Sequence, residues 1–285
     1  MTVTLLHALD PAPAREAPTV GTMLREWRQR RRYSQLALAL RADVSARHLS
    51  FVETGRAKPS REMIVHLAEF LEIPHRERNA LLVAAGFAPE HRELRLDAPE
   101  LGEVRRAVGL LLTSLEPCPA LAVDRRWTLV AHNRAAAALM SLLPAALLQP
   151  PVNVLRASLH PDGLAPRIVN LGQWRAHVLA RLGRDVELTG DAHLTALLAE
   201  LRGYPSPGGT PAGAADGDAE MPVLVPLRLR TDAGVLSFVS TTTIFGTAVD
   251  VTAAELAIES FLPADEATSH ALRLMAGAAG ETLSP

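Results

Sequence analysis

The chain has 285 residues, of which 48% are hydrophobic and 21% are charged, and its formal net charge is −2. This is the composition of a soluble globular protein with enough residues for two domains, each with its own core. The single cysteine, Cys118, excludes an intramolecular disulfide and a cysteine-rich metal site. The total charge does not suggest a nucleic-acid partner, but its distribution is uneven: residues 1–90 carry 13 basic against 10 acidic side chains.

The N-terminal residues 1–18 are rich in Ala and Pro and are predicted to form a disordered arm. They lack the basic segment and the sustained apolar stretch of a signal peptide. The longest apolar tract, residues 135–152, is interrupted by Ser141, Pro144 and Gln149, which argues against a membrane span. We therefore expect a cytoplasmic protein with no membrane partner.

A helix is predicted over residues 20–32, and two short helices joined by a tight turn follow between Ser34 and Gly55. Ser34 and Ser45 stand where the N-caps of these two helices should be. Asp43 falls in the turn, where a left-handed residue is needed, and Gly55 should end the second helix. This pattern is typical of a helix-turn-helix.

Two more helices should complete an N-terminal domain of five helices. Ser60 can cap a fourth helix that contains Ile64 and Leu67, and Pro74 ends it. A fifth helix is predicted over residues 75–85, before Gly86.

The exposed side of the second short helix indicates its use. Leu49 and Val52 should point inward, which leaves Arg47 and its neighbours outside, near the end that enters a major groove. Arg47 can donate two hydrogen bonds to guanine, and Phe51 can contact a thymine methyl group. Residues 21–61 carry ten basic against three acidic side chains. A helical hairpin with a solvated basic face is the alternative, but caps, turn, glycine and charge together favour DNA.

Residues 34–60, SQLALALRADVSARHLSFVETGRAKPS, resemble the helix-turn-helix of the Xre/Cro-type repressors, and HLSFVETGRAKPSREM resembles the MmyB-like subfamily. By this resemblance Gln35 is a candidate phosphate contact. The residues predicted to bind double-stranded DNA are Ser34, Gln35, Ser45, Ala46, Arg47, His48, Ser50, Phe51, Arg56, Lys58 and Ser60.

Beyond a charged, proline-marked linker at residues 89–99, the chain predicts an α+β domain. A helix should start near Leu101, and two β-like runs at residues 119–124 and 127–133 should form a hairpin. Asn133 can cap the next helix, and the chain then reads as mostly helical to residue 202. A flexible loop is expected at residues 203–222, and two strands at 223–230 and 235–245 should follow. The last helix is predicted at residues 253–261, before a loose tail.

This order of elements describes one antiparallel sheet with covering helices and resembles a PAS-like sensor. The segments HPDGLAPRIVNLGQW (160–174) and FGTAVDVTAAELAIESFLPADEAT (245–268) resemble the ligand-binding domain of the MmyB-like regulators. The resemblance implies a DNA-reading N-terminal domain joined to a PAS-like pocket for an elongated apolar molecule such as a fatty acid. The predicted organisation is an arm at 1–18, the Xre-type all-α domain at 19–88, the linker at 89–99, the PAS-like domain at 100–275 and a tail at 276–285.

An apolar ligand needs an apolar cavity with a few polar groups to orient its head. Bulky side chains in the second domain can line such a cavity or fill an ordinary core, and the sequence leaves both possibilities open. Arg167 suits a carboxylate head, because a guanidinium binds it with two hydrogen bonds. The predicted ligand-binding residues are Trp127, His132, Arg167, Asn170, Trp174, His177 and Phe238.

The chain carries no GxSxG, P-loop, GxGxxG or HExxH motif, and its His and Asp residues lack metal-ligand spacing. We expect no metal, no cofactor and no catalytic set. Glu255 and Glu259 are predicted to lie one turn apart on an exposed helix face.

These features predict a ligand-responsive transcription regulator associated with the nucleoid. We expect a homodimer on an inverted-repeat operator, because one short helix reads too few bases for specificity. Two alternatives remain open: an enzyme tethered to DNA by its first domain, and a constitutive DNA binder whose second domain serves only dimerisation.

Overall fold

A computed structural model describes residues 18–205, 224–246 and 250–281 of the chain. The predicted N-terminal arm, apart from Pro18, lies outside the described residues, as do most of the predicted loop at 203–222 and the end of the tail. No helix in the described ranges combines the length and the apolar character that crossing a bilayer requires.

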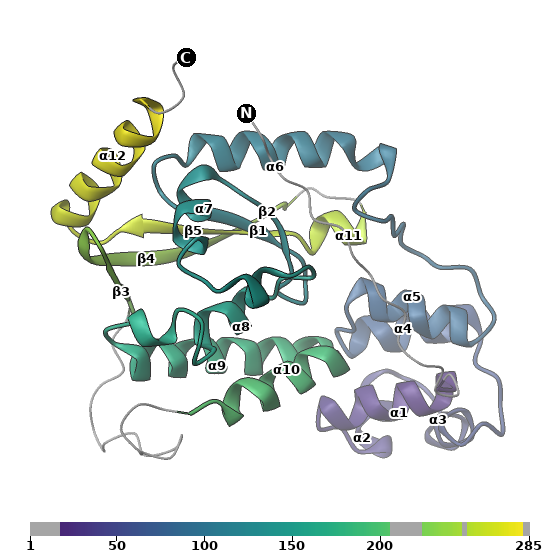
Figure 1. Cartoon of the computed structure of the whole chain (residues 1–285). Helices are drawn as coiled ribbons and strands as arrows, with labels where there is room; N and C mark the ends of the chain where they lie inside the picture. Colours follow the sequence, from purple (N-terminus) through teal and green to yellow (C-terminus); the bar gives the residue numbers. More distant parts are fainter. Residues whose placement is uncertain (1–17, 206–223, 247–249, 282–285) are drawn as a thin grey trace.

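Five helices form the N-terminal part of the chain and enclose a core of their own. Leu24 of the first helix, Leu49 of the third and Ile64 of the fourth are fully buried there. The helices are α1 (Val20–Arg30), α2 (Gln35–Arg41), α3 (Ala46–Glu53), α4 (Arg61–Phe70) and α5 (His75–Ala84). The predicted five-helix domain is therefore confirmed (Figure 1).

The local signals read from the sequence act as expected in this domain. The side chains of Ser34, Ser45 and Ser60 each accept a hydrogen bond from a backbone N–H in the first turn of α2, α3 and α4. Asp43 adopts the left-handed conformation with φ +50°, and Gly55 adopts it after the end of α3 with φ +74°. These caps and turns fix where the helix-turn-helix begins and ends.

Gly21 allows α1 to pack directly against the end of α3. A Cβ atom at this position would lie 2.2 Å from the carbonyl oxygen of Val52, which is well inside van der Waals contact. A backbone carbonyl cannot rotate away as the end of a flexible side chain can, so only glycine fits here without movement of a helix.

The C-terminal part is built on one antiparallel sheet in the order β2-β1-β5-β4-β3. Its strands are β1 (Ala120–Val123), β2 (Leu129–His132), β3 (Leu227–Thr231), β4 (Gly234–Ile244) and β5 (Ala257–Pro263). The last strand in the chain lies at the centre, where Leu121 of β1 faces Glu259 of β5. The expected PAS-like arrangement on an antiparallel sheet is confirmed.

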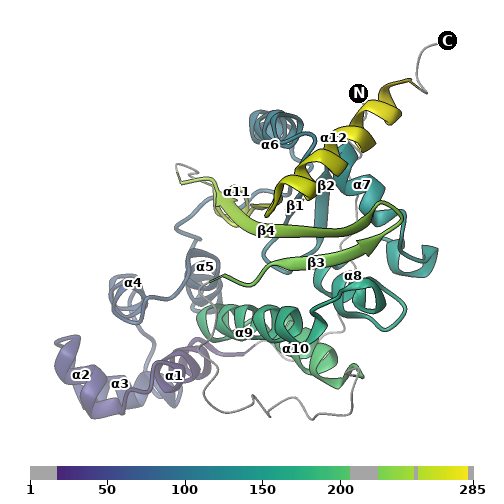
Figure 2. The same ribbon diagram turned by 90° about the vertical axis from the view of Figure 1, so that its left-hand side faces the viewer.

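Helices cover both faces of this sheet (Figure 2). On one face, Val108 and Leu112 of α6 pack on Ala120, Ala122 and Ile258. On the other face, α8, α9 and α10 enclose the larger core. The helical elements after α5 are η1 (Pro99–Leu101), α6 (Gly102–Ser114), α7 (Arg134–Met140), η2 (Ala145–Leu148), α8 (Val154–Leu159), η3 (Ala165–Arg167), α9 (Leu171–Thr189), α10 (Ala192–Gly203), α11 (Val251–Ala254) and α12 (Glu266–Glu281).

The prediction of a helix at residues 253–261 is wrong. This segment contains the end of α11 and most of β5, and a longer helix, α12, occupies most of the predicted tail. Hydrogen bonding to both β1 and β4 selects the extended conformation, although the local sequence is rich in helix formers. Glu255 and Glu259 therefore belong to different elements and do not share a helix face.

The predicted linker at residues 89–99 is fastened to both parts of the chain. Asn79 of α5 is buried, and its amide bonds the backbone of Glu90 and His91. The backbone N–H of Leu94 donates to Asp250, which caps α11. The linker thus holds the N-terminal helices against the C-terminal domain.

We expect the substitution Gly21→Ala to lower the free energy of unfolding of the N-terminal domain by about 1–3 kcal/mol, because the added methyl group overpacks the α1–α3 contact. Thermal or urea denaturation followed by circular dichroism measures the change.

Gly109→Ala is the matched control, because Gly109 lies inside α6 and a Cβ atom there has nothing within 4 Å. This change should raise stability by about 0.5–1 kcal/mol through helix propensity alone. If both variants were equally stable, the close packing of α1 on α3 would not matter for stability.

Candidate DNA-binding helix and ligand cavity

Helix α3 presents a basic surface to solvent. Arg47 and His48 are exposed, whereas Ala46, Ser50 and Phe51 are half-buried. The guanidinium of Arg47 lies 5.4 Å from the centre of the Phe51 ring, a cation–π contact that stabilises Arg47 on the outer face of the helix. Arg47 therefore lies on the solvent-exposed face of α3.

Further cations flank this helix. Arg56 and Lys58 are exposed in the loop after α3. Neither side chain forms an ion pair with another residue in the part of the chain that the structure describes. Their charges are thus available to phosphate groups, which set the position of a protein on DNA.

A buried ion pair holds α3 against α1. Arg28 of α1 donates two hydrogen bonds, of 2.7 and 2.8 Å, to the carboxylate of Glu53, and Gln35 donates a third of 2.8 Å. Burial by itself would raise the pKa of Glu53, but the hydrogen bonds from Arg28 and Gln35 outweigh it and leave that pKa below its usual value. Gln35 is a predicted phosphate contact, but its amide nitrogen donates to Glu53 inside the domain.

A cavity of about 120 Å³ lies in the C-terminal domain between the sheet and helices α7, α8 and α9. Most of its wall is apolar and includes Leu121, Leu139, Met140, Leu155, Val178 and Phe261. Three predicted ligand residues, Trp127, Trp174 and His177, also line it. The bulky residues of this domain thus leave a space that an apolar molecule can enter.

One end of the cavity is formed by an ion pair. Arg181 donates hydrogen bonds of 3.0 and 2.7 Å to the two carboxylate oxygens of Glu259, and a further one of 2.8 Å to Thr242. The guanidinium also lies 4.4 Å from the centre of the Trp127 ring. The Glu259 side chain is only 5% exposed, and the Thr242 hydroxyl donates a further hydrogen bond of 2.8 Å to its carboxylate.

Trp127 is fixed by its side chain and its backbone. Its indole N–H donates to Asp185 over 3.1 Å, and burial raises the pKa of that carboxyl group against the opposing effects of Trp127 and Arg181. The backbone of Trp127 has φ +63°, a conformation that is uncommon outside glycine. Its N–H donates to Asp124, and its carbonyl accepts from Val154.

Trp174 and His177 of α9 are held by contacts with α8 and with each other. The indole N–H of Trp174 donates to Ser158 over 3.0 Å, and the ring of His177 stacks on Trp174 with 5.6 Å between centres. Burial, followed by the charge of Arg181, lowers the pKa of His177. His177 is therefore neutral near pH 7.

The other predicted ligand residues lie outside the cavity wall. Asn170 bonds the backbone at the start of β3, and Arg167 lies in η3. Phe238 is fully buried and packs edge-to-face on Phe261, while His132 contacts the backbone of its neighbour. The predicted head-group contacts at Arg167 and Asn170 are thus separate from this cavity, and Arg181 is the arginine that reaches it.

A cluster of ion pairs joins the C-terminal domain to α5, and we name it the interdomain seam. Arg125, in the turn between β1 and β2, donates to Glu77 of α5 over 2.9 Å and lies 3.3 Å from Asp191. Arg76 of α5 donates to both oxygens of Glu255 over 2.7–3.0 Å. The seam consists of Arg76, Glu77, Arg125, Arg126, Asp191 and Glu255.

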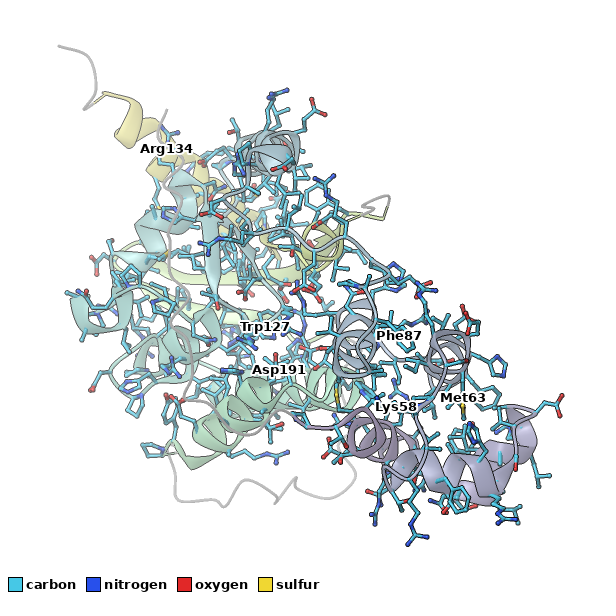
Figure 3. The ribbon with its side chains drawn as sticks, turned by 90° about the vertical axis from the view of Figure 1, so that its right-hand side faces the viewer. Lys58, Met63, Phe87, Trp127, Arg134 and Asp191 are labelled. Carbon is cyan, nitrogen blue, oxygen red and sulfur yellow. The ribbon has the colours of Figure 1, made fainter. Side chains whose placement is uncertain are left out.

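The carboxylates of the seam respond differently to burial. Burial raises the pKa of Glu77, although Arg125 opposes this. Burial also acts on Asp191, but the hydrogen bonds from Arg126 and from the His193 backbone reverse its effect and lower that pKa. Figure 3 shows Asp191 and Trp127 on the side of the C-terminal domain that faces the N-terminal helices.

The end of α9 makes another contact between the domains. Arg30 of α1 donates to the carbonyl oxygen of Val186 over 3.1 Å. Its guanidinium lies so close to Gly190 that a Cβ atom there would be 2.2 Å away. Gly190 ends α9 in the left-handed conformation and leaves room for this arginine.

Three chain segments contribute both to the cavity and to the contacts with the N-terminal domain. Trp127 lies two residues after Arg125, and Glu259 lies four residues after Glu255. In α9, Arg181 precedes the Arg30 contact at Val186 by little more than one helical turn. The residues that close the polar end of the cavity and those that contact the N-terminal helices are thus joined by short stretches of chain.

Family models match both parts of the chain. A helix-turn-helix model matches residues 24–78, and the model of the MmyB-like transcription regulator ligand binding domain matches residues 104–275. The chain belongs to the MmyB-like transcription regulators. The resemblance of the regulator to the Xre type at its N-terminus and to this family at its C-terminus is thereby confirmed. No curated protein matches the regulator's sequence.

Sequence reasoning missed Arg181, Glu259 and the seam. Trp174, His177 and Arg181 recur at spacings of three and four, which places them on one face of α9 and could have identified Arg181. Glu259 and Phe261 lie two residues apart on β5 and therefore share one face of the strand, but that segment was predicted to be a helix. No local pattern indicates the seam, because its partners come from distant segments.

An ion pair behind the cavity links α8 to α10 in the regulator. Arg156 donates two hydrogen bonds of 2.7 Å to Glu200, and the Tyr204 hydroxyl donates to the same carboxylate. The bond from Arg156, partly opposed by burial, lowers the pKa of Glu200 from 4.5 to about 2. The Tyr204 pKa rises to about 12 through burial and the neighbouring Glu200.

Because folding lowers the pKa of Glu200, its stabilising contribution is complete above pH 4.5 and disappears as the pH falls toward about 2. We expect Glu200→Gln to be less stable than the parent at pH 7, and the difference should shrink steadily below pH 4.5. Urea denaturation at a series of pH values measures it. A difference that stays constant down to pH 2 would contradict this account of the ion pair.

Proposed function

We propose that this MmyB-like regulator reads operator DNA with α3 as a homodimer, and that a small apolar molecule in the cavity changes its affinity for DNA. Its site of action would be the nucleoid in the cytoplasm. The observation that carries the proposal is the continuity between the cavity and the seam. The segments that close the polar end of the cavity also hold α5 and α1 in place.

The DNA-reading part of the proposal rests on the division of roles around α3. Arg47 is exposed on the helix itself and has the donor geometry to contact guanine O6 and N7. Arg56 and Lys58 lie in the following loop and suit phosphate contacts. In the docked arrangement the contacts between the domains come from α1 and α5, so the outer face of α3 remains accessible.

A homodimer on an inverted repeat follows from the small number of bases that one short helix can read. The C-terminal domain offers apolar surface for such a contact: Leu110 of α6 is 67% exposed and Leu274 of α12 is 62% exposed. We propose that this domain supplies most of the dimer interface, with the symmetry of the protein matched by that of the operator.

The ligand part of the proposal rests on a largely apolar wall with a few polar groups at one end, which is the usual form of a small-molecule site. The resemblance to the family suggests a fatty acid. A bound molecule would contact Trp127 and Arg181. It would thereby favour an arrangement of the seam that differs from the one without ligand.

Arg47→Ala should weaken binding to a selected operator by about 1–3 kcal/mol, because it removes a bidentate contact to a base, and should affect random DNA less. Titration of labelled duplexes with the purified regulator measures both affinities.

Arg56→Ala and Lys58→Ala are the matched controls for phosphate contacts. Each should weaken binding to operator and random DNA alike and should reduce the slope of log K against log salt by about 1. Equal losses on both kinds of DNA for Arg47→Ala would show that this residue does not read bases.

Arg125→Ala should uncouple the two domains, because it removes the ion pair with Glu77 and the contact with Asp191. Apolar ligands should still bind the cavity, but the change that they cause in operator affinity should fall at least about fivefold, since allosteric couplings are typically 5–150-fold. Operator titrations with and without ligand measure this ratio.

Arg95→Ala is the control, because Arg95 is 70% exposed in the neighbouring linker and pairs with Asp97 only two residues away. It should leave the response to ligand intact. A full response in Arg125→Ala would exclude the seam as the connection between cavity and DNA.

A further inference from the structure

We infer that the cavity selects an uncharged apolar molecule carrying a hydroxyl or carbonyl group, and that it discriminates against a free carboxylate. The inference rests on the proposed function, because it assumes that the cavity is a ligand site. It departs from the ionised fatty acid that the family resemblance suggests and assigns an uncharged molecule in its place. It concerns the charge of the head group, which the position of Glu259 decides.

The wall of the cavity has no net charge. Among the described residues that line it, Arg181 and Glu259 are the only pair with charged side chains, and they neutralise each other. His177 adds no charge, because burial keeps its imidazole neutral. A carboxylate would therefore enter a site that holds no uncompensated positive charge.

Arg181 is already occupied. Its two terminal nitrogens bond both oxygens of Glu259, one of them also bonds Thr242, and its face lies on the Trp127 ring. An incoming carboxylate would have to lie beside Glu259 on the same guanidinium. Two like charges at such a distance repel each other.

Displacing Glu259 does not resolve this conflict. The Glu259 side chain is 5% exposed on the central strand, so it would remain buried without its partner. A buried carboxylate that loses its counter-ion is strongly destabilising. Binding as the neutral acid is also unfavourable, because a carboxyl group with an ordinary pKa near 4.3 is protonated in only about one molecule in 500 at pH 7.

An uncharged head group finds partners that are free. Ser240 and His177 both line the cavity, and neither side chain forms a hydrogen bond with another residue in the described ranges. The Ser240 hydroxyl can donate or accept, and a neutral imidazole offers one donor and one acceptor nitrogen. A hydroxyl or carbonyl group can thus be satisfied without disturbing the ion pair.

The volume indicates a compact ligand. At about 120 Å³ the cavity is slightly smaller than an engineered apolar cavity of about 150 Å³ that binds benzene. We therefore choose short-chain probes for the test, in pairs that have the same carbon number and differ only in the head group.

The experiment is calorimetric titration of the full-length regulator at pH 7 with hexan-1-ol and hexanoate, and with octan-1-ol and octanoate. Each alcohol should bind at least about tenfold more tightly than the matching carboxylate. Glu259→Gln removes the competing negative charge and frees Arg181, so this variant should shift the ratio at least about tenfold in favour of the carboxylate.

Glu103→Gln is the control for Glu259→Gln, because Glu103 is 90% exposed on α6 and should leave the ratio unchanged. If Glu259→Gln does not fold, the ratio of alcohol to carboxylate affinity in the parent protein still tests the inference. Tighter binding of the carboxylate by the parent would overturn the inference and leave the proposed function standing. Absence of binding by all four probes would overturn both.

Discussion

The contact between the two domains centres on the guanidinium of Arg125, which lies among the carboxylates of Glu77 and Asp191 and within 4.0 Å of Glu255. Burial has raised the pKa of Glu77, so the ionised form of this carboxylate depends on the arginine. Buried ion pairs contribute little net stability. Removing one partner nevertheless destabilises the protein strongly, because it leaves the other charge buried and uncompensated. The seam is therefore better suited to holding one defined orientation of the two domains than to stabilising the fold.

The cavity can stay open only if its wall is held in place, because ordinary cores leave few voids larger than a water molecule. Here the space is kept by side chains that are fixed elsewhere. Trp127 is tied to Asp185 and covered by Arg181, and Trp174 is tied to Ser158. Trp127 is also connected to the turn that carries Arg125, because its backbone N–H donates to the carbonyl oxygen of Asp124. The wall of the cavity and the contacts between the domains thus share the segment that carries Trp127 and Arg125.

The helix-turn-helix could be predicted in detail because its signals are local: three serine caps, a left-handed Asp43 and a terminal Gly55. The sheet could be predicted except for β5, whose sequence favours a helix and whose strand pairing is set by distant β1 and β4. Trp127, Trp174 and His177 could be placed near a pocket from their type. Arg181 could have been placed on the same face of α9 as Trp174 and His177 from its spacing. Glu259 and the seam could not, because an ion pair between segments far apart in the chain leaves no periodic pattern in either segment.

The central claim is that the cavity and the seam respond together, and hydrogen–deuterium exchange of the full-length regulator tests it most directly. Saturating octan-1-ol should slow exchange in α9 and at residues 124–131, which surround the cavity. If the account is correct, it should also change exchange in α5, which contributes no residue to the cavity wall. Changes confined to the segments that line the cavity, with α5 unaffected, would contradict the account.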